Sequence, residues 1–140
     1  IEYTPEEQTF ARGIQKSTMK PEIGIKSVIT PLEATRENPG GGSTDVGDVS
    51  FVVPTISLSV TTAPKDTPWH SWTVVACSGM SIGHKGMHYA SKALAMTMVD
   101  LFEDAKLREE VKAEFKERKG DYVYQGILPD GPPPLKGLNK

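Results

Sequence analysis

His70 is the residue in this sequence whose setting best suits metal or proton chemistry. It stands in the run Pro68–Trp72 (P-W-H-S-W), between two segments that are predicted to be strands. Loops at the ends of strands are where ligand groups gather in α/β proteins, and neutral imidazole is a common metal ligand near neutral pH. The alternative is a partly exposed histidine packed among aromatic side chains, and the local pattern favours neither interpretation.

His84 and His88 stand four residues apart at the start of a predicted helix, so they share one face of it. Helical zinc pairs use this spacing, but the metalloprotease pattern needs a glutamate directly after the first histidine, and Lys85 stands there. A lysine opposes a metal cation by its charge, so a pair of polar residues on a helix surface is the favoured interpretation. His84 could instead contact an anion at the helix N-terminus, where Lys85 would reinforce the site.

The stretch Gly40–Thr55 gathers glycines, small hydroxyl residues and two acids ahead of an apolar run. Asp45 is a suitable helix N-cap, and Asp48 three residues later gives a weak variant of the capping box. A flexible loop that caps a short helix is therefore the favoured interpretation of this stretch alone. The alternative is a polar active-site loop in which Ser43, Thr44 and Asp45 face a ligand. The lysine of a phosphate-binding loop is missing, which disfavours nucleotide binding.

The bulk composition bounds the class of protein. The formal net charge of −2 gives no electrostatic argument for nucleic acid or an anionic membrane as a partner, and the apolar stretches are shorter than the ~20 residues of a membrane span. The single cysteine, Cys77, excludes an intrachain disulfide and is expected to be a small buried hydrophobe. With no visible signal peptide, the sequence suggests a reducing, cytoplasmic setting.

Two segments have the character of β-strands. Residues 55–62 alternate polar and apolar side chains as far as Val60, with Ile56, Leu58 and Val60 on one face, and residues 73–77 contain the apolar run Val74–Cys77. Two strands make a poor sheet by themselves. With three or four helices they predict an α/β layer that is either a piece of a larger sheet or completed by association.

The other regular elements are predicted to be helices. The first runs from Pro5 to about Lys16 or Ser17, and a long one begins at Ser81 or Gly83. Either a continuation of this helix or a second helix ends at Gly120. The apolar face of the long helix is formed at spacings near 3.6 residues by Met87, Ala90, Leu94, Met98, Leu101 and Phe102.

Four segments, taken in order, resemble one known family. They are Gly42–Ser50, Val53–Thr55, Pro68–Trp72 and Ile82–Met87. Together they are similar to the C-terminal part of aminobenzoyl-glutamate hydrolases, which belong to the wider group of zinc aminoacylases and glutamate carboxypeptidases. The resemblance covers most of residues 1–120, and residues 121–140 form a proline-rich tail that is expected to be extended.

The resemblance implies a fold and an activity. The fold would be a three-layer α/β/α metallopeptidase-type catalytic domain interrupted by a lid domain, with this chain forming the portion after the lid. The activity would be hydrolysis of the amide bond of N-acyl amino acids such as aminobenzoyl-glutamate. Two divalent metals, zinc or in some members manganese, would polarise the amide carbonyl and activate a water. A homo-oligomer is also implied, and neither nucleic acid nor membrane is an expected partner.

The resemblance also assigns roles to residues. His70 matches the family's late metal-binding histidine. Ser43, Thr44 and Asp45 correspond to a loop beside the site that orients a ligand or contacts substrate, and His84 is assigned a substrate-carboxylate or structural role. The catalytic glutamate and the other metal ligands belong to the N-terminal half of the family's domain, so no catalytic residue is expected here.

One histidine cannot hold a catalytic zinc, which typically has three protein ligands. The isolated chain is therefore expected to lack hydrolase activity and to need the rest of the catalytic domain for its metals. The alternative, from a different class of function, is a free-standing non-catalytic module for association or regulation.

Overall fold

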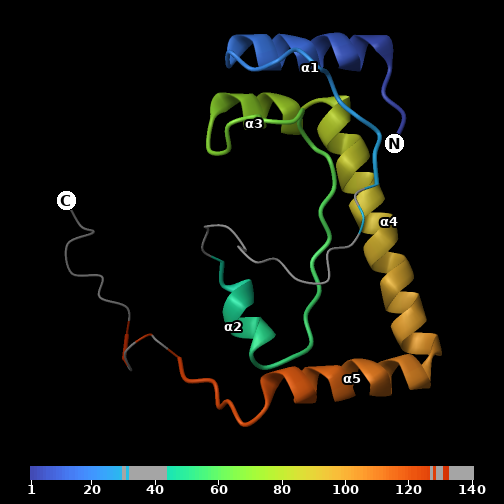
Figure 1. Ribbon diagram of the computed structural model, residues 1–140, viewed down its shortest axis with the longest axis vertical. Helices are drawn as coiled ribbons and strands as arrows, with labels where there is room; N and C mark the ends of the chain where they lie inside the picture. Colours follow the sequence, from blue (N-terminus) through green and yellow to red (C-terminus); the bar gives the residue numbers. More distant parts are fainter. Residues whose placement is uncertain (30, 32–43, 127, 129–130, 133–140) are drawn as a thin grey trace. The chain divides into compact units, whose positions relative to one another are not determined.

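The computed structural model describes residues 1–29, 31, 44–126, 128 and 131–132. Their regular structure consists of helices, which are coloured in chain order in Figure 1. These helices are α1 (Pro5–Ser17), α2 (Val46–Ser50), α3 (Trp72–Ser78), α4 (Ser81–Glu103) and α5 (Ala105–Lys119). None of the described helices has the length and apolar character needed to cross a membrane.

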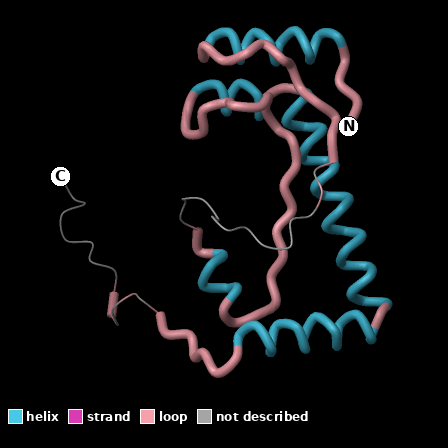
Figure 2. Tube along the Cα trace, viewed as in Figure 1, coloured by secondary structure: helices cyan, strands magenta, loops and turns pink. Residues whose placement is uncertain are grey.

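The predicted α/β/α architecture is wrong for the described part of the chain, in which no residue belongs to a β-strand (Figure 2). The predicted strand at 73–77 lies inside helix α3. A short apolar run fits a buried strand and a buried helix equally well. The helix forms because Thr73 and Cys77, four residues apart, then share one face and are both buried.

The predicted strand at 55–62 is also wrong, although its alternation of side chains is real. These residues lie outside both helix and strand, and Ile56 and Leu58 on the predicted buried face are exposed. A strand needs neighbours that complete its backbone hydrogen bonds. No other strand is present in the described ranges to supply them, so the alternating pattern does not produce a sheet.

The chain divides into two compact units, and each is described by itself. The first unit draws its described residues from Ile1–Pro39 and Ser57–Leu107, and the second draws its described residues from Gly40–Ile56 and Arg108–Lys140.

Helix α1 in the first unit confirms the predicted helix at its N-terminal end. Thr4 is the N-cap and forms a capping box with Glu7: the Thr4 amide donates to Glu7 Oε2 at 2.7 Å, and the Glu7 amide donates to Thr4 Oγ1 at 3.3 Å. The buried face of α1 includes Ala11, which packs with Ile25 and with Ile82 at the start of α4. This small cluster is the apolar core of the unit.

Two glutamines of α1 hold the segment that follows the helix. The side-chain amide of Gln8 donates to the Ile25 carbonyl at 2.8 Å and accepts from the Ile25 amide at 2.9 Å. The side-chain amide of Gln15 likewise makes two hydrogen bonds with Gly24: it accepts from the Gly24 amide at 2.8 Å and donates to the Gly24 carbonyl at 3.3 Å. Gly24 has a φ of +71°, and a Cβ there would lie 2.3 Å from Gln8 Oε1, so only glycine fits.

Helices α3 and α4 approach each other closely where α4 begins. A Cβ on Gly83 would lie 2.7 Å from the Cys77 and Ser78 carbonyl oxygens, and one on Gly86 would lie 2.5 Å from the Thr61 carbonyl oxygen. Burial raises the pKa of the Cys77 thiol, as expected for a cysteine that acts as a small hydrophobe. The absence of side chains at the two glycines thus lets α4 seat against α3 and the 61–62 backbone.

The second unit packs around Phe51, which directly follows α2. Its ring centroid lies 5.0 Å from that of Tyr122 and 5.8 Å from that of Tyr124, which stacks on it. On α5, Arg118 pairs with Glu114 at 3.1 Å, as the spacing of four residues predicts. Gly120 follows α5 with a φ of +54°, which confirms it as the residue that ends the helix.

Candidate functional site

The residues predicted to form the site fall in different parts of the chain. Ser43 lies outside the described residues. Thr44 and Asp45 belong to the second unit, whereas His70 and His84 belong to the first. Their surroundings are therefore given unit by unit.

His70 occupies a tight turn immediately before helix α3. Its φ is +61°, a left-handed conformation that is uncommon for a residue with a Cβ, and its side chain is exposed. Ser71, the N-cap of α3, donates from Oγ to the Pro68 carbonyl at 2.6 Å, and its Oγ lies 2.6 Å from Thr73 Oγ1. These bonds fix the backbone on the C-terminal side of His70.

The loop leading into this turn is anchored at several points. Pro64 and Thr67 are buried, and Thr67 Oγ1 donates to the Pro64 carbonyl at 2.7 Å. Gln15 of α1 donates from Nε2 to the Lys65 carbonyl at 3.4 Å. The loop is thus held against α1, and His70 is presented from a supported backbone.

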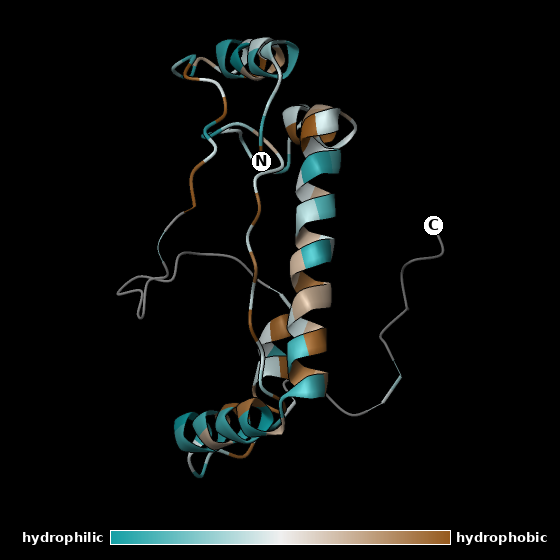
Figure 3. Cartoon of the chain, turned by 90° about the vertical axis from the view of Figure 1, so that its right-hand side faces the viewer, coloured by the Kyte–Doolittle hydropathy of each residue, from teal (hydrophilic) through white to brown (hydrophobic). Residues whose placement is uncertain are grey.

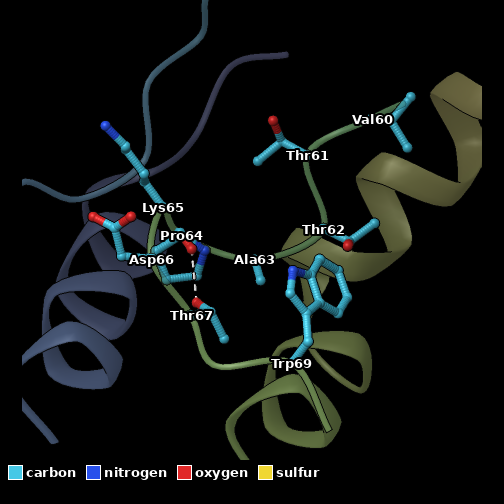
Figure 4. A pocket seen from close by; sticks show the side chains of 9 residues that line it. All are labelled: Val60, Thr61, Thr62, Ala63, Pro64, Lys65, Asp66, Thr67 and Trp69. Atoms are coloured by element: carbon cyan, nitrogen blue, oxygen red, sulfur yellow. Dashed lines mark hydrogen bonds between the residues drawn. The ribbon is translucent and has the colours of Figure 1, made fainter. Parts of the chain in front are cut away.

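A cavity of about 210 Å³ lies beside the turn and is lined by residues 60–67 and Trp69. In Figure 4 the indole of Trp69 lies next to Thr62 and Ala63, while Lys65 and Asp66 lie at the opposite side of the loop. Ligand pockets commonly enclose about 300–1,000 Å³. This cavity is too small to hold a dipeptide-like substrate by itself and gives at most one wall of such a site.

The described residues do not by themselves fit a catalytic metal. Nowhere among them do three histidine, cysteine, aspartate or glutamate side chains come together as a metal-binding group. His70 is one imidazole donor where a catalytic zinc takes three protein ligands. The prediction that His70 binds metal therefore depends on ligands from beyond the described part of the chain.

The start of α4 holds a partly buried ion pair that the sequence did not reveal. Lys85 Nζ donates to Glu7 Oε2 at 2.6 Å, and Ser81 Oγ donates to Glu7 Oε1. The hydrogen bonds from Lys85 and then Ser81 lower the pKa of Glu7 from 4.5 to about 2, although burial opposes the shift. The local sequence signals a helix start at Thr4, but a partner 78 residues away leaves no such signal.

This ion pair bears on the predicted role of His84. Lys85 would have reinforced an anion site at the N-terminus of α4, but its ammonium group is held by Glu7. His84 and His88 are both exposed on α4. The contact of His84 with a substrate carboxylate stays a prediction, and Lys85 does not add a free positive charge beside it.

In the second unit, helix α2 begins after Asp45, as the cap prediction required. Thr44, the residue before Asp45, accepts a hydrogen bond from the first turn of the helix: the Val46 amide donates to Thr44 Oγ1 at 3.3 Å. The side chain of Asp45 makes no capping hydrogen bond, and Asp45 is exposed. Its carboxylate is therefore available for another contact, whereas Asp48 hydrogen-bonds Tyr124 and raises the pKa of that phenol.

A larger cavity of about 380 Å³ lies between the end of α2 and α5 in the second unit. Its lining includes the aromatic residues Phe51, Phe115 and Tyr122. Glu114 and Arg118, which form an ion pair, also line it. Neither Thr44 nor Asp45 lines it, so the predicted loop residues and this cavity are separate features.

Comparison with known proteins tests the resemblance found in the sequence segments. No family model matches the sequence, and no solved structure matches it. A curated relative, one of the subunits of p-aminobenzoyl-glutamate hydrolase from Escherichia coli (strain K12), is 36% identical over 117 residues. The chain is similar to part of an aminobenzoyl-glutamate hydrolase.

The match confirms the resemblance found from the four sequence segments. It covers 82% of this chain and 24% of the hydrolase subunit, so the chain spans about a quarter of the length of that relative. A continuous stretch covering 82% of 140 residues must include the middle of the chain, with Asp45, His70 and His84. The wider grouping with zinc aminoacylases and glutamate carboxypeptidases stays a prediction.

Proposed function

We propose that this chain supplies one part of the active site of a metal-dependent amidohydrolase that cleaves N-acyl amino acids such as aminobenzoyl-glutamate. The observation that carries the proposal is the 36% identity over 82% of the chain to a protein named for hydrolysis of that substrate. The proposed setting is the cytoplasm, where Cys77 stays a buried thiol, and the proposed assembly is a homo-oligomer.

In this proposal His70 is one metal ligand, and the metal is zinc or manganese. Support comes from its exposed imidazole, its left-handed backbone and the hydrogen bonds that hold the turn around it. Residues held in sparsely populated conformations by their surroundings cluster at active sites. The remaining ligands and the catalytic glutamate would come from polypeptide that corresponds to the three quarters of the E. coli subunit outside the match.

In this proposal the residues before α2 contact the substrate. Asp45 has an exposed carboxylate that makes no capping bond, so it is available to orient a ligand or contact the substrate. Ser43 and Thr44 would contribute hydroxyl groups beside it. His84, exposed on the first turn of α4, is the group proposed to meet a carboxylate of the substrate.

The test is hydrolysis of aminobenzoyl-glutamate by the chain alone and by the chain co-expressed with the E. coli subunit from which the matched segment has been deleted. The chain alone is expected to give no turnover, and the co-expressed pair is expected to give metal-dependent turnover. His70→Ala in the pair is expected to lower turnover at least about 100-fold. His88→Ala removes another exposed histidine that has no assigned role and should leave the rate unchanged.

Two results would contradict the proposal. Metal-dependent turnover by the isolated chain would show that the site is complete without other polypeptide. Full turnover by the His70→Ala pair would remove His70 from the site. If no combination hydrolyses the substrate although the two polypeptides bind each other, the free-standing association or regulatory module becomes the better account.

A further inference from the structure

Helix α4 exposes an apolar face along much of its length, and Figure 3 shows apolar residues recurring from its start to its end. Met87, Leu94 and Met98 are 55%, 53% and 57% exposed. Their spacings of seven and four residues place them on one side of the helix. We call these three residues the α4 apolar face.

The core of the first unit uses only the beginning of the same helix. The residues of α4 that are buried are Ile82, Gly83 and Gly86, all in its first two turns. They seat the helix against α1, α3 and the backbone at Thr61. The sequence predicted an apolar face on this helix, and the described residues leave each of its three members more than half exposed.

An amphipathic helix normally turns its apolar side to a core. Contiguous exposed apolar surface on a folded protein marks an interaction site. Two of the three side chains are methionines, which adapt their shape to irregular apolar surfaces. The α4 apolar face therefore suits a polypeptide surface that is itself apolar.

We propose that the α4 apolar face is the docking surface for polypeptide equivalent to the three quarters of the E. coli hydrolase subunit that lies outside the match. The inference rests on the proposed function. The length of the match indicates this occupant, because the chain accounts for only 24% of that subunit. A hydrolase assembled from this chain also needs the polypeptide that corresponds to the unmatched part of the subunit. That polypeptide must bind this chain through an exposed surface.

The experiment compares two methionines on opposite sides of α4. Met98 belongs to the face, whereas Met96 is 68% exposed and lies about 200° away around the helix. The chain is co-purified with the E. coli subunit lacking its matched segment, and the dissociation constant is measured. Met98→Glu is expected to weaken binding at least about tenfold, because a carboxylate would be buried without a partner. Met96→Glu, the same chemical change outside the face, is expected to leave binding within about twofold.

A second measurement covers the case in which the two polypeptides do not assemble in trans. In a chimera, this chain replaces the matched segment of the E. coli subunit, and the same two substitutions are compared by thermal unfolding. Only Met98→Glu is expected to lower the melting temperature. Equal effects of the two substitutions in either experiment overturn the docking face, as does a stable homodimer of the wild-type chain that Met98→Glu dissociates.

The outcomes separate this inference from the proposed function. Binding that depends on Met98 without any hydrolysis keeps the docking face and removes the activity. Hydrolysis by an assembled pair that tolerates Met98→Glu keeps the activity and removes the docking face.

Discussion

The ion pair between Glu7 and Lys85 joins α1 to the first turns of α4, and its removal is the sharpest test of how the first unit is held together. Glu7 is 7% exposed and accepts hydrogen bonds from Lys85, Ser81 and the Thr4 amide. Glu7→Gln keeps the size of the side chain and removes its charge. It leaves the Lys85 ammonium, whose side chain is 34% exposed, without its anion.

The magnitude follows from the pKa of Glu7. A decrease from 4.5 to about 2 corresponds to about 3 kcal/mol of preference for the charged carboxylate in the folded state. Solvent reaches part of Lys85 and screens the pair, which reduces this figure. Hydrogen bonds to charged groups contribute about 1.5–3 kcal/mol. Glu7→Gln is therefore expected to lower the free energy of unfolding by about 2 kcal/mol.

The dependence on pH has a definite sign. The pKa of Glu7 is lower in the folded chain than in the unfolded chain, so the carboxylate stabilises the fold fully above pH 4.5. That stabilisation is lost as the pH falls from about 4.5 towards 2. The wild type and Glu7→Gln should therefore differ most near neutral pH and converge near pH 2.

The assay is urea unfolding followed by helical circular dichroism between pH 7 and pH 2. Glu6→Gln is the matched control, since Glu6 is an exposed acid in the same turn of α1 and should change stability much less. A Lys85→Met variant completes a double-mutant cycle, and its coupling energy with Glu7→Gln should be favourable. Equal effects of Glu7→Gln and Glu6→Gln, or a difference from wild type that does not change with pH, would refute the reasoning.

Two further predictions concern the backbone of the first unit. Gly86→Ala is expected to lower the free energy of unfolding by about 1–3 kcal/mol, because the added Cβ would lie 2.5 Å from the Thr61 carbonyl oxygen. Gly13 has open space around it in α1, so Gly13→Ala should instead stabilise the fold by about 0.5–1 kcal/mol. Equal destabilisation by the two substitutions in urea titrations would contradict the close packing at Gly86. His70→Gly is expected to raise the melting temperature and His70→Val to lower it, since a φ of +61° suits glycine and strains a β-branched residue; the opposite order would contradict the left-handed turn.

The helices were predictable because their signals are local. The period of 3.6 residues identified α1, α4 and the helix ended by Gly120, and a cap followed by acids marked the start of α1. The strand prediction for residues 73–77 was wrong because a run of four or five residues is too short to distinguish the period of a strand from that of a helix. Its helical state is decided by which side chains can be buried together, and that is a tertiary property.

The candidate site was predictable only as separate pieces. His70 could be placed between two predicted strands, although one of them proved to be helix α3 and the other lies outside both helix and strand. The partner of Lys85 could not be found, because the pairing depends on how α1 lies against α4 across 78 residues of sequence. The apolar face of α4 was identified correctly as a pattern, but a periodic pattern does not say which polypeptide covers it.

The central claim is that His70 is a metal ligand in a site completed by other polypeptide. The most direct measurement is the metal content of the purified complex between this chain and the E. coli subunit without its matched segment, determined by elemental analysis. We predict bound zinc or manganese with the wild-type chain and with His88→Ala, and at least about a tenfold loss of affinity for metal with His70→Ala. The same metal content and affinity in the His70→Ala complex would contradict the account.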